Sequence, residues 1–429
     1  METTGVSKQR LFTSYQVFVI AVLALIQFTV VLDFMIISPL GAILMEELDI
    51  QPAQFGWVVS AYAFSAGASG LLAAGFADKF DRKKLLLFFY TGFMAGTVLC
   101  AVATGYYFLL VARIITGLFG GVVSSIGYAI VTDLFALNVR GRVMGFIQMA
   151  FAVSQVLGIP IGLYLANHYG WHSTFWMIAV FGILLGLVIA VYMKPVRQHL
   201  VVRTHQQPFM HLIKTVSNKK YLQAFLATTL LATGGFMLMP FSSAFNIHNL
   251  GISLDDLPLL YGITGVSAMV LSPLIGRASD QLGKYRVFFA GSVLSSIMAA
   301  IYVNMGVTPF ATVALVSVLL FAGVGSRMIS ATAILTAVPQ LQDRGAFMSV
   351  NASVQQVSGG IAAAIAGMIV IEKPGGQLAH YNTLGYIVIV SMIICMWLLY
   401  FVNRNISAKP EPPARQQDVQ RLSHSKQFP

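Results

Sequence analysis

Residues 276–286 read GRASDQLGKYR, and a related stretch, AGFADKFDRKK, occupies residues 74–84. Asp280 lies 202 residues after Asp78, and basic residues follow each of these two aspartates. Both stretches connect long apolar runs. A polar loop that recurs between apolar runs indicates that one structural unit occurs twice along the chain.

A second pair of loops supports this duplication. Arg344 and Gly345 lie 204 residues after Arg140 and Gly141. Two independent loops with nearly the same offset predict two related halves of six membrane spans each. An even number of spans in each half makes the two copies parallel, so that an axis along the membrane normal relates them.

The composition indicates a membrane protein. Hydrophobic residues make up 57% of the 429 residues and charged residues only 10%, whereas soluble domains carry about 25% charged residues. The net charge of +11 comes from short segments between the apolar runs. These segments form no continuous basic face, so we exclude nucleic-acid binding.

The apolar runs predict twelve spans, each long enough to cross about 30 Å of hydrocarbon as a helix. The first run is too long for a signal peptide and has no small-residue cleavage pattern, so we interpret it as a span. We predict an all-α integral membrane protein with spans at 15–45, 54–77, 85–104, 107–134, 143–167, 172–193, 221–248, 256–278, 285–304, 308–338, 346–371 and 381–403.

The distribution of Lys and Arg predicts the orientation. Nearly all 26 basic residues fall in the segments that this topology places on one side; the exceptions are Arg113, Arg327 and Lys373. Because basic residues favour the cytoplasmic side, both termini should be cytoplasmic, in a bacterial inner membrane. The expected segments are an N-terminus at 1–14, halves at 15–193 and 221–403, a cytoplasmic linker at 194–220 and a disordered tail at 404–429.

The repeated loops resemble a signature of the major facilitator superfamily. Residues 276–286 match its Gly-x-x-x-Asp-x-x-Gly-Arg/Lys-x-Arg/Lys pattern at every defined position, whereas residues 74–84 depart from it at Ala74 and Asp81. Arg113-Ile-Ile-Thr-Gly117 is similar to the superfamily's motif in the fourth span. The resemblance implies a twelve-helix secondary transporter.

One further motif resembles the drug:proton antiporter branch. Gly158-Ile-Pro160-Ile-Gly162 is similar to the antiporter motif of the fifth span, except that Ile159 replaces the glycine expected before the proline. The resemblance to this branch implies proton-coupled export, but it says little about the substrate.

Asp33 and Arg113 are the main candidates for coupling and substrate binding. Asp33 lies near the middle of the first predicted span, in VVLDFMIISPL. A carboxylate at such depth costs about 2.5–3.5 kcal/mol, so it should face a cavity or a partner. Arg113 is the natural partner, and the resemblance assigns this arginine to coupling or substrate binding. The structural alternatives are a static pair and a clamp between helices.

Charged residues of the loops form a candidate cytoplasmic gate. Ion pairs there can hold one conformation and break in another, although ordinary positive-inside topology also explains the basic members. The candidate gate residues are Asp78, Arg82, Asp133, Arg140, Asp280, Lys284, Arg286, Asp343 and Arg344.

Polar, aromatic and methionine side chains within the spans are candidates for a substrate cavity. Arg327 has two interpretations: it binds an anionic part of a substrate, or it pairs with backbone at a helix end. The candidate cavity residues are Gln27, Tyr62, Gln148, Gln155, Phe236, Met239, Arg327, Asn351 and Gln356.

The sequence therefore predicts proton-coupled antiport of a small amphipathic compound by a monomer in the lipid bilayer. A sugar or metabolite exporter and an uptake symporter remain alternatives within transport. The chain has no Gly-x4-Gly-Lys-Ser/Thr loop, so ATP hydrolysis is not expected. We expect no metal, no cofactor and no enzymatic activity. A non-transporting receptor would not need Asp33 inside a span.

Overall fold

The computed structural model describes residues 12–76, 80–197, 215–340 and 343–407. Twelve of its helices are long and apolar enough to cross a membrane, which confirms the predicted number. The helices of the first half are α1 (Ser14–Ile36), α2 (Gly41–Glu47), α3 (Pro52–Phe76), α4 (Arg82–Ala101), α5 (Tyr106–Leu134), α6 (Leu137–Val153), η2 (Ser154–Gly158), α7 (Ile159–Tyr169) and α8 (His172–Tyr192).

The second half repeats this order. Its elements are α10 (Lys219–Phe236), η4 (Met239–Phe241), α11 (Ser242–Ala244), η5 (Phe245–Asn249), α12 (Leu257–Leu282), α13 (Lys284–Val303), α14 (Phe310–Leu335), α15 (Arg344–Ile369), the strands β1 (Ile371–Glu372) and β2 (Leu378–Ala379), and α16 (Tyr381–Ser407). The two-residue strands pair antiparallel.

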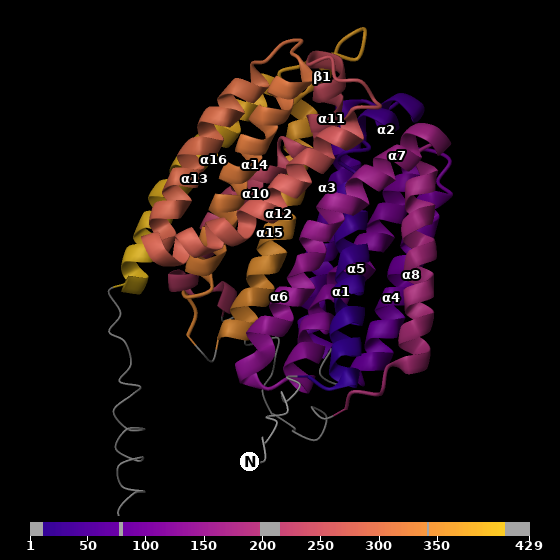
Figure 1. Ribbon diagram of the computed structural model, residues 1–429, viewed down its shortest axis with the longest axis vertical. Helices are drawn as coiled ribbons and strands as arrows, with labels where there is room; N and C mark the ends of the chain where they lie inside the picture. Colours follow the sequence, from indigo (N-terminus) through magenta and orange to yellow (C-terminus); the bar gives the residue numbers. More distant parts are fainter. Residues whose placement is uncertain (1–11, 77–79, 198–214, 341–342, 408–429) are drawn as a thin grey trace, which may run out of the picture.

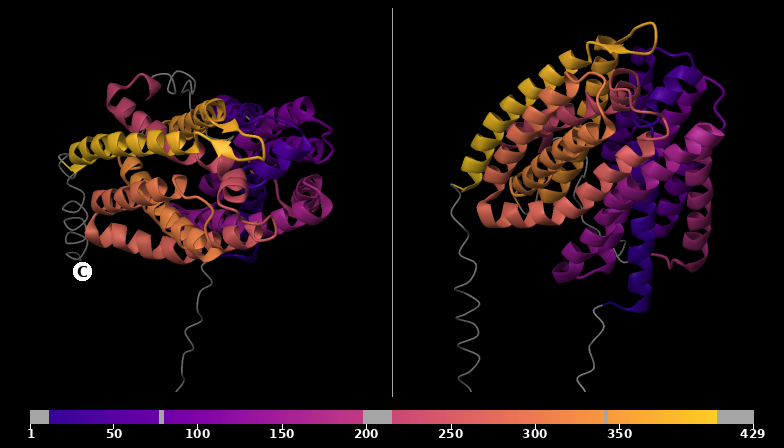
Figure 2. Two further views of the ribbon diagram at one scale, coloured as in Figure 1. Left: turned by 90° about the horizontal axis from the view of Figure 1, so that it is seen from above. Right: turned by 45° about the horizontal axis from the view of Figure 1, so that its top comes forward.

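The two halves lie side by side (Figures 1 and 2). We call the end that carries α2, α11 and β1 the hairpin end (top of Figure 1). The opposite end, where α1 begins, α8 ends and α10 begins, is the linker end.

Three spans are less regular than the sequence suggested. The first predicted span, 15–45, is interrupted between α1 and α2, where Pro39 lies, and the seventh is interrupted at Pro240. Proline lacks an N–H and its ring clashes with the carbonyl four residues earlier, which favours an interruption of the helix at these two positions. In the fifth span, the π-helical turn η2 precedes Pro160.

Close packing of small residues joins the halves along α3 and α15. A Cβ atom added to Gly56 would lie 2.8 Å from the carbonyl oxygen of Ala363. One turn further, Ser60 Oγ donates a hydrogen bond to the carbonyl oxygen of Gly360 at 2.7 Å. Such small residues let membrane helices approach until their backbones touch.

Further hydrogen bonds between the halves lie at the hairpin end. Ser243 Oγ accepts from the backbone N of Ala42 at 3.2 Å and donates to the carbonyl oxygen of Ser38 at 3.1 Å. Asn167 Nδ2 donates to the carbonyl oxygen of Leu254 at 2.7 Å. Ser243 and Asn167 thus join the two halves at the hairpin end.

Candidate functional site

An ion pair between Asp33 and Arg113 lies inside the first half. Arg113 Nη1 is 2.8 Å from Asp33 Oδ2 and also donates to the carbonyl oxygen of Asp33 at 3.3 Å. Both side chains are 0% exposed. Thr97 of α4 donates to the other carboxylate oxygen, Oδ1, at 3.2 Å. Three helices, α1, α4 and α5, therefore meet at this carboxylate.

The aromatic ring of Tyr62 covers the guanidinium of Arg113. The Arg113 Cζ atom lies 4.6 Å from the centre of the ring, within the range of a cation–π interaction. Arg113 Nε and Nη2 have no hydrogen-bond partner in the described chain. The pair thus keeps donors that a further acceptor, such as a substrate, could use.

The glycine of the fourth-span motif explains how Tyr62 reaches this position. A Cβ atom on Gly117 would lie 2.4 Å from the carbonyl oxygen of Tyr62 and 2.2 Å from Ser65 Oγ. Only glycine permits this approach of α3 to α5. The motif therefore supplies both the charge, at Arg113, and the contact that places an aromatic ring over it.

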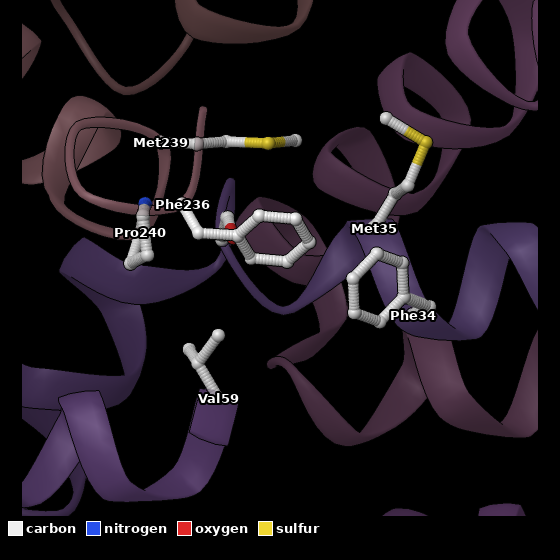
Figure 3. Close-up of a pocket in the computed structure, with 7 residues that line it drawn as sticks. Phe34, Met35, Val59, Phe236, Met239 and Pro240 are labelled. Atoms are coloured by element: carbon white, nitrogen blue, oxygen red, sulfur yellow. The ribbon is translucent and has the colours of Figure 1, made fainter. Parts of the chain in front are cut away.

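A small hollow lies between the halves next to the ion pair. Its volume is about 10 Å³, which is near the lower limit for one water molecule. Phe34 and Met35 face Phe236 and Met239 across it (Figure 3). The ring centres of Phe34 and Phe236 are 5.7 Å apart. The hollow cannot hold a substrate in this conformation, because aromatic and methionine side chains from both halves close it.

The other predicted cavity residues do not line this hollow. Gln27 and Gln155 are half-buried, whereas Gln148 is exposed and donates to Tyr128 at 3.4 Å. Asn351 accepts a hydrogen bond from Thr228 at 2.6 Å within the second half.

Two further predicted residues lie apart from it as well. Gln356 lies at the α3–α15 contact, where its Cβ is 3.4 Å from a Cβ built on Gly67. Arg327 is 2% exposed and lies well inside α14, away from its ends. The structure thus brings Tyr62, Phe236 and Met239 near the ion pair and places the remaining candidates elsewhere.

At the linker end of the first half, Arg82 and Asp133 form an ion pair with an Nε–Oδ2 distance of 3.0 Å. Arg140 instead donates to the carbonyl oxygens of Phe135 and Thr132, at 2.8 and 2.7 Å. Arg140 thereby caps the end of α5. Asp78 lies outside the described residues.

A second ion pair at the linker end, between Asp81 and Arg197, was not anticipated from the sequence. Arg197 Nε lies 2.7 Å from Asp81 Oδ2, and the backbone N atoms of Lys83 and Val196 donate to Oδ1. Burial by itself raises the pKa of the Asp81 carboxyl, but these hydrogen bonds outweigh it and hold that pKa below its usual value. The signal was visible in the sequence, because Asp81 replaces a glycine of the signature.

The second half has no copy of this arrangement. At the position of Asp81 it carries Gly283, whose φ of +100° favours glycine. Asp280, Lys284 and Arg286 are exposed, and the structure shows no ion pair for them with any described residue. Asp343 accepts a hydrogen bond from the hydroxyl of Tyr221 at 2.7 Å. The side chain of Arg344 lies outside the described part.

Comparison with known proteins identifies the family. A model described as Major Facilitator Superfamily matches residues 23–246 and 224–428. The uncharacterized MFS-type transporter YceJ of Bacillus subtilis (strain 168) is 25% identical over 279 residues, which cover 65% of this chain and 70% of that protein. Multidrug resistance protein 2 of the same organism is 22% identical over 300 residues, covering 68% and 74%.

Among solved structures, the fold is similar to that of a bacterial homologue of the human lysosomal transporter Spinster, crystallised in an inward-facing and unoccupied conformation. The TM-score is 0.74 and the sequence identity 16%, over 94% of this chain and 100% of that one. The matched regions of the family model extend over both six-helix halves. The chain is therefore a multi-pass membrane protein that belongs to the Major Facilitator Superfamily of transporters.

Proposed function

We propose that this protein exports a small amphipathic compound in exchange for protons, by alternating access. The observation that carries the proposal is the ion pair of Asp33 and Arg113, whose two side chains are both 0% exposed. A carboxylate and a guanidinium are expensive to bury, and replacing such a pair with apolar residues is often neutral or stabilising. Its presence in the interior therefore favours a functional role.

In the proposed cycle, a proton and the substrate compete for this pair. A substrate bound beside the pair uses the negative charge of Asp33 and the two unpartnered nitrogens of Arg113. Protonation of Asp33 removes that charge, which in the empty protein holds Arg113 Nη1 at 2.8 Å, so the proton displaces the substrate. Loss of the proton on the other side restores the charge and prepares the pair for the next substrate. The protein acts as a carrier and catalyses no covalent reaction in this scheme.

The basic residues support an assignment of the two ends to the two sides of a bacterial inner membrane. Lys and Arg concentrate at the linker end, so this end and both termini are cytoplasmic in the proposal. The hydrogen bonds of Ser243 then close the outer side. Exchange requires these contacts to break while the linker ends of the halves approach each other, with Arg82–Asp133 and Asp81–Arg197 as members of the inner gate.

Side chains beside the pair support an amphipathic substrate. Phe34, Met35, Phe236 and Met239 would line the path once the halves separate. Aromatic rings and flexible methionines adapt to varied apolar shapes. The similarity to multidrug resistance protein 2 agrees with this substrate class. Both halves of the path come from one chain, which is consistent with a functional monomer.

Transport by proteoliposomes tests the proposal. With an imposed pH gradient, we expect proton-driven movement of ethidium, an amphipathic cation, by the wild-type protein. Asp33→Asn should reduce this movement at least about tenfold, whereas the control Asp255→Asn, at an exposed loop residue, should transport normally. Full proton-driven transport by Asp33→Asn would refute the role of Asp33. Movement of substrate and protons in the same direction would replace antiport with symport.

A further inference from the structure

Arg327 is a buried cation that has no compensating charge among the described residues. It lies within α14 and is 2% exposed. Its Nε and Nη2 atoms have no hydrogen-bond partner in the described chain. A buried charge that lacks a partner is strongly destabilising, so a compensating group is expected beside it.

The second half contains no acidic side chain at the level of Arg327. Its acidic residues all lie in loops or near helix ends: Asp255, Asp256, Asp280, Asp343 and Glu372. The nearby thiol of Cys395 does not supply the charge either. Cys395 Sγ lies 3.8 Å from the carbonyl oxygen of Ala227 as a hydrogen-bond donor, which suits a thiol that keeps its hydrogen.

The internal repeat shows what is missing. Phe236 lies 202 residues after Phe34, the same offset as in the repeated loops, and the two rings contact each other across the halves. At this offset Asp33 corresponds to Gly235, so α10 has the adjacent glycines Gly234 and Gly235 where α1 has a carboxylate.

The two arginines themselves are not equivalent in sequence. Arg327 lies 214 residues after Arg113, which is about three helical turns beyond the offset of the loops. It nevertheless contacts the region of α10 that corresponds to Asp33. Each half thus directs an arginine at its first helix, but only the first half provides an anion there.

The guanidinium packs directly against α10 where the carboxylate is missing. A Cβ atom on Gly234 would be 3.2 Å from Arg327 Nη1 and 3.7 Å from Nη2, with Met392 Cε also at 3.7 Å. A Cβ on Gly235 would meet no described atom within 4 Å. Space is therefore open beside Gly235, next to a guanidinium that packs against Gly234, and a guanidinium with unpartnered N–H donors suits one small, singly charged anion.

We propose that Arg327 and Gly234 form a binding site for a singly charged anion, either a halide or a carboxylate group. The anion takes the place that a side-chain carboxylate occupies in the first half, and it neutralises Arg327. Its source is either a free ion or the carboxylate of an organic compound. The site does not depend on the proposed proton coupling.

Thermal unfolding of the detergent-purified protein tests this site. Chloride, formate or benzoate is titrated against sodium HEPES at constant ionic strength, with benzamide as the uncharged match of benzoate. Because ligands of the native state raise the midpoint, we expect a rise of about 3 °C that benzamide does not produce. A rise with chloride and formate identifies a free ion as the source, whereas a rise with benzoate alone identifies an organic carboxylate. No rise with any of the three anions overturns the proposal.

Two isosteric variants separate charge from packing. Gly234→Asp supplies a carboxylate beside Arg327, so it should raise the midpoint in sodium HEPES without chloride, formate or benzoate and abolish the dependence on these three anions. Gly234→Asn, which adds nearly the same volume without charge, should not raise it. Equal behaviour of these two variants overturns the site even if Arg327→Met fails to fold. If Arg327→Met does fold, an anion dependence equal to that of the wild type also overturns it.

Discussion

Replacing Arg113 with methionine removes a charge from the interior but keeps an unbranched side chain in its place. In the native structure, Arg113 Nη1 donates to the Asp33 carboxylate at 2.8 Å and to its carbonyl oxygen at 3.3 Å. The variant leaves this carboxylate, which is 0% exposed, with Thr97 as its described hydrogen-bond donor. Removing one member of a buried pair costs about 3–5 kcal/mol, and we expect that loss in the free energy of unfolding.

Removing both charges should have the opposite effect. The double variant Asp33→Leu/Arg113→Met replaces the pair with apolar side chains of similar size, a change that is often neutral or stabilising. We therefore expect it to regain about 3 kcal/mol relative to Arg113→Met. This corresponds to a factor of roughly 150 in the unfolding equilibrium.

The measurement can use the protein's own cysteines. Cys100 and Cys395 are both free and buried, so a thiol-reactive fluorescent probe reports unfolding as the detergent-solubilised protein is heated at pH 7. Arg286→Met, at an exposed position, is the matched control and should change stability by less than about 0.5 kcal/mol. The reasoning is refuted if Arg113→Met is as stable as the wild type, or if the double variant is no more stable than Arg113→Met.

Three other predictions concern packing, pH and the gate. Gly117→Val should lower the free energy of unfolding by about 1–3 kcal/mol and reduce transport, because the valine side chain would overlap α3. The control Gly145→Ala should be neutral in the same unfolding assay, because a Cβ at this position meets no described atom within 4 Å. Because the pKa of Asp81 is lowered, its contact with Arg197 stabilises the protein at pH values above the ordinary pKa of a carboxyl group, and this stabilisation disappears as pH falls through the lowered pKa. Asp81→Asn should therefore lower the unfolding midpoint at pH 7 and reduce the change of the midpoint between pH 5 and pH 3. An unchanged dependence of the midpoint on pH would contradict this prediction. Asp280→Lys should alter the transport rate in proteoliposomes, although the variant protein should reach the membrane in normal amounts, since Asp280 has no described partner in this conformation. A normal transport rate would argue against a gate in the second half.

The sequence predicted the spans and the central ion pair for a simple physical reason. Charged residues are rare inside long apolar runs, so Asp33 and Arg113 stand out, and each requires a partner. Hydrophobic patterning does not show local breaks as clearly. Pro39 lies within an apolar run, and the run therefore predicted one span where the structure has α1, a turn and α2.

Contacts between distant segments were the hardest to predict. Asp81 precedes α4 and Arg197 follows α8, and their pairing depends on how these helices pack. Likewise, the composition of the spans could not show that Gln148 is exposed while Phe236 faces Phe34. The direction in which a helical side chain points depends on the rotation of the helix, which the neighbouring helices determine.

The hydrogen bonds of Ser243 have a consequence for the populations of the two access states. The hydroxyl group of Ser243, in the second half, binds both Ala42 and Ser38 of the first half, and each such bond contributes about 0.5–1.5 kcal/mol net. Separating this end therefore requires a few kilocalories per mole, an amount that leaves a minor state populated at the level of about 0.1–10%. A compound that binds the minor state about 10⁴-fold more tightly reverses a ratio of about 1:99, so a differential affinity of this size is sufficient to drive the cycle.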